Sequence, residues 1–80
     1  MGILLVDDHP MIRLGLAHFL GEGLNGLPVR EAGSGEEALQ QVQEELPGLV
    51  IMDFDLPGIS GLETTRRLRQ RLPQLRVLFF

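Results

Sequence analysis

Four apolar runs of the chain alternate with three segments whose apolar residues recur at helical spacing. The run Ile3–Val6 has no polar alternation, which is typical of a strand covered on both faces. Leu49–Met52 repeats this pattern, 28–32 predicts a shorter strand, and 75–80 predicts a last one. The chain is therefore expected to contain four strands, two of them fully buried.

Three helices are predicted between these strands. The first begins at Pro10, which a first helical turn tolerates, and is expected to stop at Gly21. The second follows Ser34, whose hydroxyl stands three residues before a glutamate as a cap, and it ends before Pro47. The third ends before Pro73. The stripes expected to face the core are Ile12, Leu16, Phe19 and Leu20, then Leu39, Val42 and Leu46, and finally Leu62, Thr65, Leu68 and Leu72.

The resulting order, βαβαβαβ, predicts the α/β fold class. Strands that alternate with helices favour a parallel sheet with right-handed crossovers and helices on its faces. A flavodoxin-like strand order of 2-1-3-4 would make the first and third strands neighbours. Residues 1–80 are expected to form a single structural unit.

Composition narrows the function classes. A chain of 80 residues with 44% hydrophobic residues and a mean hydropathy of +0.12 predicts a packed core. The absence of cysteine excludes disulfide frameworks and thiolate zinc sites. A net charge of −4 disfavours non-specific binding to nucleic acid. We therefore interpret the arginines at 66–71 as a solvent-exposed helix face and not as a nucleic-acid-binding surface. No apolar run is long enough for a membrane span, and a cytoplasmic location is expected.

Aspartates follow the two most apolar strands. Asp7 and Asp8 come directly after the first strand, and Asp53 comes directly after the third. Because ligands of open parallel sheets bind at the carboxyl ends of the strands, the three carboxylates are expected to crowd one rim. Such a cluster favours a hard divalent cation, Mg²⁺ above all, and a carboxylate can also accept a phosphoryl group.

Two simpler interpretations apply to parts of this pattern. A single acid before a helix is commonly only a cap, which is the alternative for Asp8. His9 beside the acids could ligate a metal, but Mg²⁺ prefers oxygen ligands and a histidine at a helix start is usually exposed, so we expect an exposed His9. The GxGxxG pattern at 21–26 follows a predicted helix instead of a first strand, so we interpret it as a loop without dinucleotide binding.

Three separated segments of the chain resemble the receiver domains of two-component response regulators. They are 6–10, with its acidic pair, then 52–58, and Gly61-Leu62-Glu63. The subgroup they are most similar to precedes a LuxR-type (FixJ-type) helix-turn-helix. The resemblance implies a protein that is not an enzyme and that receives a phosphoryl group from a sensor histidine kinase.

The resemblance also assigns roles to residues. It implies that Asp53 is the phosphoacceptor, that Asp7 and Asp8 organise Mg²⁺, and that the backbone carbonyl of Asp55 is a further metal ligand. It implies DNA binding only through an output domain that is absent from these 80 residues.

The chain departs from the family in its length and in its basic residues. It is expected to be the N-terminal portion of a receiver domain, without the fifth strand and the last two helices. The family's Ser or Thr after the fourth strand is then missing, and the chain contains no Lys to contact the phosphoryl group. We therefore expect Mg²⁺ binding to survive better than phosphorylation.

Two other functions and one assembly remain open at this stage. Asp53 and Asp55 also match the DxD pattern of haloacid-dehalogenase-like phosphatases, and a protein-interaction module that is never phosphorylated is the third class. The segment 75–80 would be an unprotected edge strand, which predicts a homodimer or a strand-exchanged oligomer.

Overall fold

The fold is a parallel sheet of four strands with helices on both faces. The computed structural model describes residues 2–23 and 28–80. Its elements are β1 (Ile3–Val6), α1 (Pro10–Gly23), β2 (Val29–Ala32), α2 (Gly35–Glu44), β3 (Leu49–Met52), α3 (Gly61–Arg71) and β4 (Val77–Phe79). The strand order is β2-β1-β3-β4, which confirms the predicted α/β class and topology.

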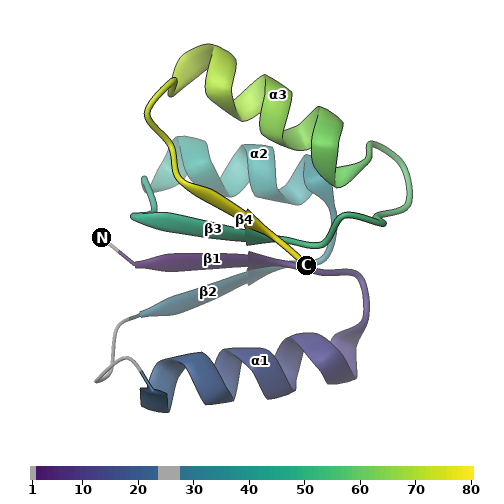
Figure 1. Ribbon diagram of the computed structural model, residues 1–80, viewed down its shortest axis with the longest axis vertical. Coiled ribbons are helices and arrows are strands. Elements are labelled where there is room, and N and C mark those ends of the chain that lie inside the picture. The colour runs from purple at the N-terminus through teal and green to yellow at the C-terminus, as the bar shows by residue number, and fades with distance from the viewer. Residues whose placement is uncertain (1, 24–27) are drawn as a thin grey trace.

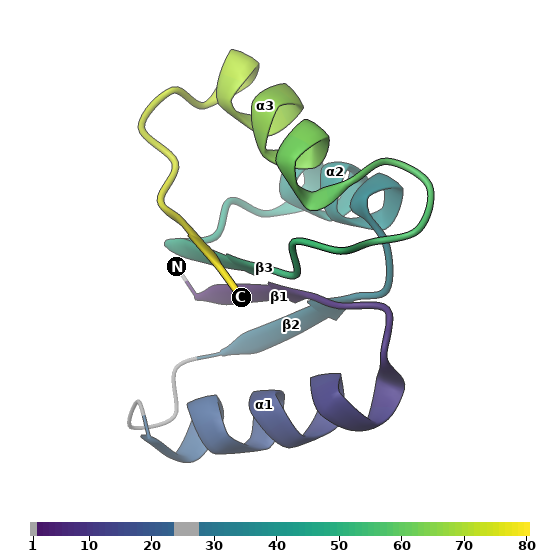
Figure 2. The same ribbon diagram turned by 45° about the vertical axis from the view of Figure 1, so that its right-hand side comes forward.

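The two faces of the sheet are covered unequally. Helix α1 lies alone on one face, against β1 and β2, while α2 and α3 lie side by side on the other (Figures 1 and 2). The core sits between the sheet and this pair of helices. Its buried members are Leu4, Val6, Ala32, Ala38, Val42, Val50, Met52, Leu56 and Leu68.

Serine hydroxyl groups cap the starts of α2 and α3. The hydroxyl of Ser34 accepts the backbone N–H of Glu37 at 3.1 Å, and Ser60 accepts that of Glu63 at 3.0 Å. Each contact satisfies one of the backbone donors that a first helical turn leaves unpaired. The predicted start of α2 is therefore confirmed, whereas the Ser60 cap of α3 was not predicted.

The predicted end of the first helix was wrong. Helix α1 runs past Gly21 to Gly23, because a glycine weakens a helix by only about 1 kcal/mol and does not stop it. The rest of the predicted glycine-rich loop, 24–26, lies outside the described residues. The last strand is also shorter than predicted, since pairing with β3 is limited to Val77–Phe79.

Several predicted core positions are exposed. Ile12 and Phe19 of α1 face outward, as do Leu46 and Leu62. Helix α1 carries apolar side chains on most of its circumference, so helical spacing alone does not identify its buried side. Leu46 lies beyond the end of α2, and Leu62 is the second residue of α3.

No helix within residues 2–23 and 28–80 combines the length and the apolar character needed to cross a membrane.

Candidate functional site

The backbone places two aspartates at the same edge of the sheet. Asp7 directly follows β1 and Asp53 directly follows β3, and these strands are neighbours. The N–H of Asp7 donates to the carbonyl of Ala32 at 3.0 Å, and the N–H of Asp53 donates to that of Val6 at 2.8 Å. The ladder thus continues one residue beyond each strand and fixes the level from which both carboxylates project.

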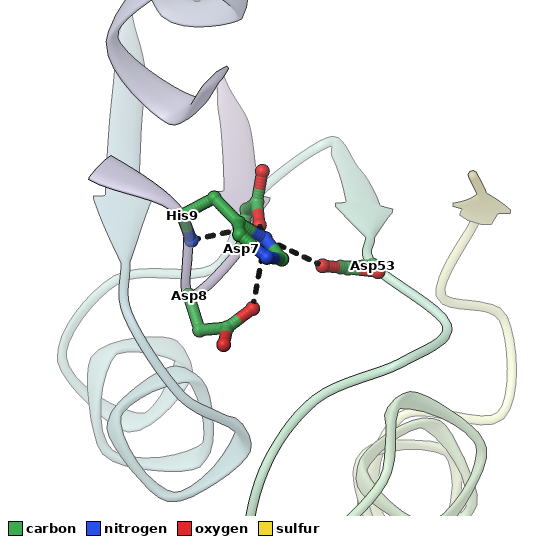
Figure 3. Close-up of side chains that lie close together, drawn as sticks. All are labelled: Asp7, Asp8, His9 and Asp53. Carbon is green, nitrogen blue, oxygen red and sulfur yellow. Dashed lines mark hydrogen bonds and ion pairs between the residues drawn. The ribbon is translucent and has the colours of Figure 1, made fainter. Parts of the chain in front are cut away.

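Four side chains converge at this rim, which we call the acidic rim: Asp7, Asp8, His9 and Asp53 (Figure 3). One potential ligand atom from each lies within 4.8 Å of all the others. The structure therefore brings together all three aspartates whose side chains the sequence singled out. His9 is exposed, as predicted, but its ring nitrogen lies beside the carboxylates.

The buried carboxylate of Asp7 is only partly hydrogen-bonded. Its side chain is 1% exposed, and its Oδ2 atom has no hydrogen-bond partner among the described residues. A buried carboxylate oxygen without a partner is costly, and a bound cation would compensate it. The donor set of three carboxylates fits Mg²⁺, which prefers oxygen ligands.

The like charges at the rim perturb one another. Burial raises the pKa of Asp53 above its ordinary value, and the neighbouring carboxylates of Asp7 and Asp8 raise it further, against the hydrogen bond from the Asp55 N–H. Burial also acts to raise the pKa of Asp7, but hydrogen bonds from the backbone and the ring of His9 outweigh it and lower that pKa. The hydrogen bond to Asp7 and the charge of Asp8 raise the pKa of His9.

The loop after β3 holds Asp53 in place. Its Oδ1 atom accepts the N–H of Asp55 at 3.0 Å, which closes a tight turn. Gly58 has a φ of 72°, a backbone conformation that favours glycine, and this fits the predicted turn at Pro57 and Gly58. Gly61 lies so close to the Asp53 carbonyl that a Cβ atom there would collide with it. The start of α3 is thus packed directly against the phosphoacceptor candidate.

The contacts that the side chains of His9 and Arg13 make at the acidic rim were not predicted from the sequence. The ring of His9 turns toward the carboxylates although 59% of the side chain is exposed. Arg13 donates from its guanidinium to the backbone carbonyl of Asp7 at 2.9 Å and to Glu31 at 3.0 Å. The sequence carried no signal for these contacts, because the direction of each side chain depends on how the chain turns into α1 and how α1 packs on the sheet.

A groove of 580 Å³ lies elsewhere, between α2 and α3. Leucines such as Leu39, Leu46 and Leu72 line it together with Arg67 and Arg71, and it contains no carboxylate or histidine. The chemistry of the described residues is therefore concentrated at the acidic rim and not in this groove.

Comparison with known proteins identifies the family. The family model of the response regulator receiver domain matches residues 3–80. The chain belongs to this family. This match favours the interpretation as a response regulator receiver domain over the interpretation as a haloacid-dehalogenase-like phosphatase.

Relatives and solved structures agree with this assignment. The chain is 43% identical over 77 residues to the response regulator GacA of Pseudomonas viridiflava, covering 95% of this chain and 36% of that protein. It is similar to the response regulator TrrA of Thermotoga maritima, solved in complex with Mg²⁺ and BeF, with a TM-score of 0.87, 40% identity, and coverage of 96% and 66%. A LuxR-family response regulator from Aurantimonas gives a TM-score of 0.88 and 40% identity, covering 98% of this chain and 56% of that one.

Proposed function

We propose that this receiver domain accepts a phosphoryl group on Asp53 from a sensor histidine kinase, with Mg²⁺ bound beside it. The observation that carries the proposal is the convergence of Asp7, Asp8 and Asp53 at one rim, where a buried carboxylate oxygen has no hydrogen-bond partner in the described part of the chain. We assign the metal ligands to the side chains of these three aspartates and to the backbone carbonyl of Asp55. The neighbour TrrA supports the metal, because its structure contains Mg²⁺.

In this proposal the reaction is a transfer between two protein side chains. A carboxylate oxygen of Asp53 forms a bond to phosphorus while the bond from phosphorus to the donor nitrogen of the kinase breaks, which leaves an acyl phosphate. Mg²⁺ would offset the negative charge that the phosphoryl oxygens bring to the rim. Asp55 holds Asp53 by its backbone N–H, and Arg13 holds the Asp7 carbonyl, so the acceptor meets the donor in a fixed orientation.

The domain would act as a signalling module and not as an enzyme with its own substrate. One phosphoryl group is accepted by each Asp53, and its charge would bias the surface of the domain between two states. An output domain would then carry the DNA-binding function, as the LuxR-family neighbour suggests by its family name. A cytoplasmic site of action follows from this role.

We further propose that residues 1–80 are the N-terminal portion of a receiver domain. The chain spans 36% of the length of GacA and 66% of the TrrA chain. The phosphate-contacting Ser or Thr and the Lys of the family have no counterpart in these residues. Phosphorylation is therefore expected to be slow relative to complete receivers, while Mg²⁺ binding is retained.

Acetyl phosphate labelling tests the proposed acceptor. Intact-mass measurement with acetyl phosphate and Mg²⁺ should show one added phosphoryl group that hydroxylamine removes and that Asp53→Asn abolishes. Glu44→Gln, an exposed carboxylate on α2, is the matched control and should label like the parent. Labelling that persists in Asp53→Asn contradicts the assignment.

We also propose that the free edge of β4 pairs two copies of the chain. Among the described strands, β4 is hydrogen-bonded only to β3, and the side chains of Leu78, Phe79 and the following Phe80 are exposed. Open apolar edges of this kind recruit further strands. Light scattering should detect a dimer that Leu78→Lys disrupts and that Leu14→Lys, at an equally apolar exposed site on α1, leaves intact. A monomer at every concentration contradicts the pairing.

A further inference from the structure

The ring of His9 occupies an unusual place for an exposed side chain. Its Nδ1 atom lies 3.0 Å from Asp7 Oδ1, 3.1 Å from Asp8 Oδ1 and 3.8 Å from Asp53 Oδ2. Figure 3 shows the ring among the three carboxylates, with its nitrogen directed at them. One nitrogen atom is therefore within reach of every carboxylate at the rim.

The backbone builds this position. The N–H of His9 donates to Asp7 Oδ1 at 3.0 Å, and the carbonyl of His9 accepts the N–H of Arg13 at 2.9 Å. A residue before proline is disfavoured in the helical conformation, so Pro10 favours an extended His9 backbone where the chain turns into α1. The backbone of His9 is thus hydrogen-bonded on both sides of its Cα atom. This fixes the residue at the start of α1, from which its ring reaches the acidic rim.

The spacing of these atoms suits a shared ion. Donor atoms bound to an octahedral ion at about 2.1 Å are about 3.0 Å apart. Nδ1 stands at this separation from oxygens of Asp7 and of Asp8, and it forms an aligned hydrogen bond only with the former. The buried Asp7 Oδ2 atom, which has no hydrogen-bond partner within residues 2–23 and 28–80, independently indicates that the rim suits a cation.

We propose that His9 Nδ1 is a further protein ligand at the acidic rim, beside the three aspartates and the Asp55 carbonyl, and that it increases the preference of the site for first-row transition ions such as Ni²⁺ over Mg²⁺. This inference rests on the proposed metal site at Asp7, Asp8 and Asp53. Carboxylates and water alone suit Mg²⁺, whereas an imidazole nitrogen favours Ni²⁺, Cu²⁺ and Zn²⁺. The identity of the bound metal would then depend on which ions are available to the domain, because His9 adds affinity for transition ions to a carboxylate site that suits Mg²⁺.

Calorimetric titration of the full chain with MgCl₂ and with NiCl₂ tests the assignment. The decisive variant is His9→Asn, whose amide retains an oxygen ligand for Mg²⁺ but no imidazole. We expect it to weaken Ni²⁺ binding by roughly 10- to 100-fold and to change Mg²⁺ binding by less than about threefold. His18→Asn, which removes the other histidine of the chain, is the matched control and should change neither.

A second measurement observes the ligand itself. With Mn²⁺ bound, pulsed electron paramagnetic resonance should detect a coupled imidazole nitrogen that His9→Asn removes. A thermal melt confirms that the variant is folded.

Other outcomes separate the two proposals. If the parent chain binds Mg²⁺ while His9→Asn binds Ni²⁺ like the parent, the His9 ligand is refuted and the metal site stands. If His9→Asn binds Mg²⁺ more tightly, the ring competes with the ion as a tethered cation, which also overturns the inference. If the parent binds neither ion, the metal site of the proposed function fails with it.

Discussion

Leu5 and Leu78 are residues of one type on one face of the same sheet, with only Ile51 between them in the register, yet their environments differ completely. Leu5 is 0% exposed, and Leu78 is 57% exposed. Helix α1 packs against β1 and β2, so Leu5 is covered, whereas β4 lies at the margin of the sheet with no second neighbouring strand (Figure 2).

The comparison shows that burial is set by position and not by hydrophobicity. The centre of the sheet, β1 and β3, carries the packed core and presents the acidic rim at its end. The margin, β4 and the outer surfaces of the helices, has equally apolar side chains that contact solvent. The same substitution should therefore change the free energy of unfolding more at the centre of the sheet than at its margin.

The largest difference is expected between Leu5→Ala and Leu78→Ala. Removing the buried side chain leaves a cavity and should lower the free energy of unfolding by about 2–5 kcal/mol. The exposed position should lose less than about 0.5 kcal/mol. Urea denaturation at a concentration where the chain is monomeric measures both. An equal loss at Leu78 would show that something covers this margin.

Two glycines provide the next test. In Gly61→Ala the new methyl group would meet the Asp53 carbonyl and Met52, so we expect a loss of about 1–3 kcal/mol and weaker Mg²⁺ binding. Gly15 lies on α1 with no atom within 4 Å of a Cβ, so Gly15→Ala should stabilise the chain by about 0.5–1 kcal/mol. Thermal unfolding of both variants checks the opposite signs.

Arginines should show a smaller contrast. Arg13 is half-buried and links α1 to Glu31 and to the Asp7 backbone, so Arg13→Ala should cost about 1–2 kcal/mol. Arg66 pairs with Glu63 on the outer surface of α3, where solvent screens the pair, and Arg66→Ala should change unfolding very little. A larger loss for Arg66 than for Arg13 would invert the comparison.

The smallest effect concerns the charge of Asp53. Because its folded pKa is raised above the ordinary value of 3.8, both states are protonated below that pH, and ionisation opposes folding as the pH rises through the folded pKa. Asp53→Asn should thus match the parent in acid and melt a few degrees higher at neutral pH without metal. Glu44→Gln should show no such pH-dependent gain, and Mg²⁺ should reverse the order by stabilising the parent more than Asp53→Asn, which has lost one carboxylate ligand.

The acidic rim was partly predictable. Asp7 and Asp53 each follow an apolar run, and the parallel order of the strands is enough to expect their carboxylates at one edge. The ring of His9 was not predictable in the same way, because its direction depends on the backbone turn into α1 and on the hydrogen bond to Asp7. Arg13 was missed for a similar reason, since only the packing of α1 on the sheet brings its guanidinium to the carbonyl of Asp7.

The amino-acid sequence by itself determined the order of the elements, the strands Ile3–Val6 and Leu49–Met52, and the capping of α2, since these follow from local spacing and local hydrogen bonds. Only the tertiary structure decided which side of α1 is buried, where β4 is left uncovered, and which atoms meet at the acidic rim. Each of these depends on contacts between residues far apart in the chain, and periodicity along the sequence does not contain that information.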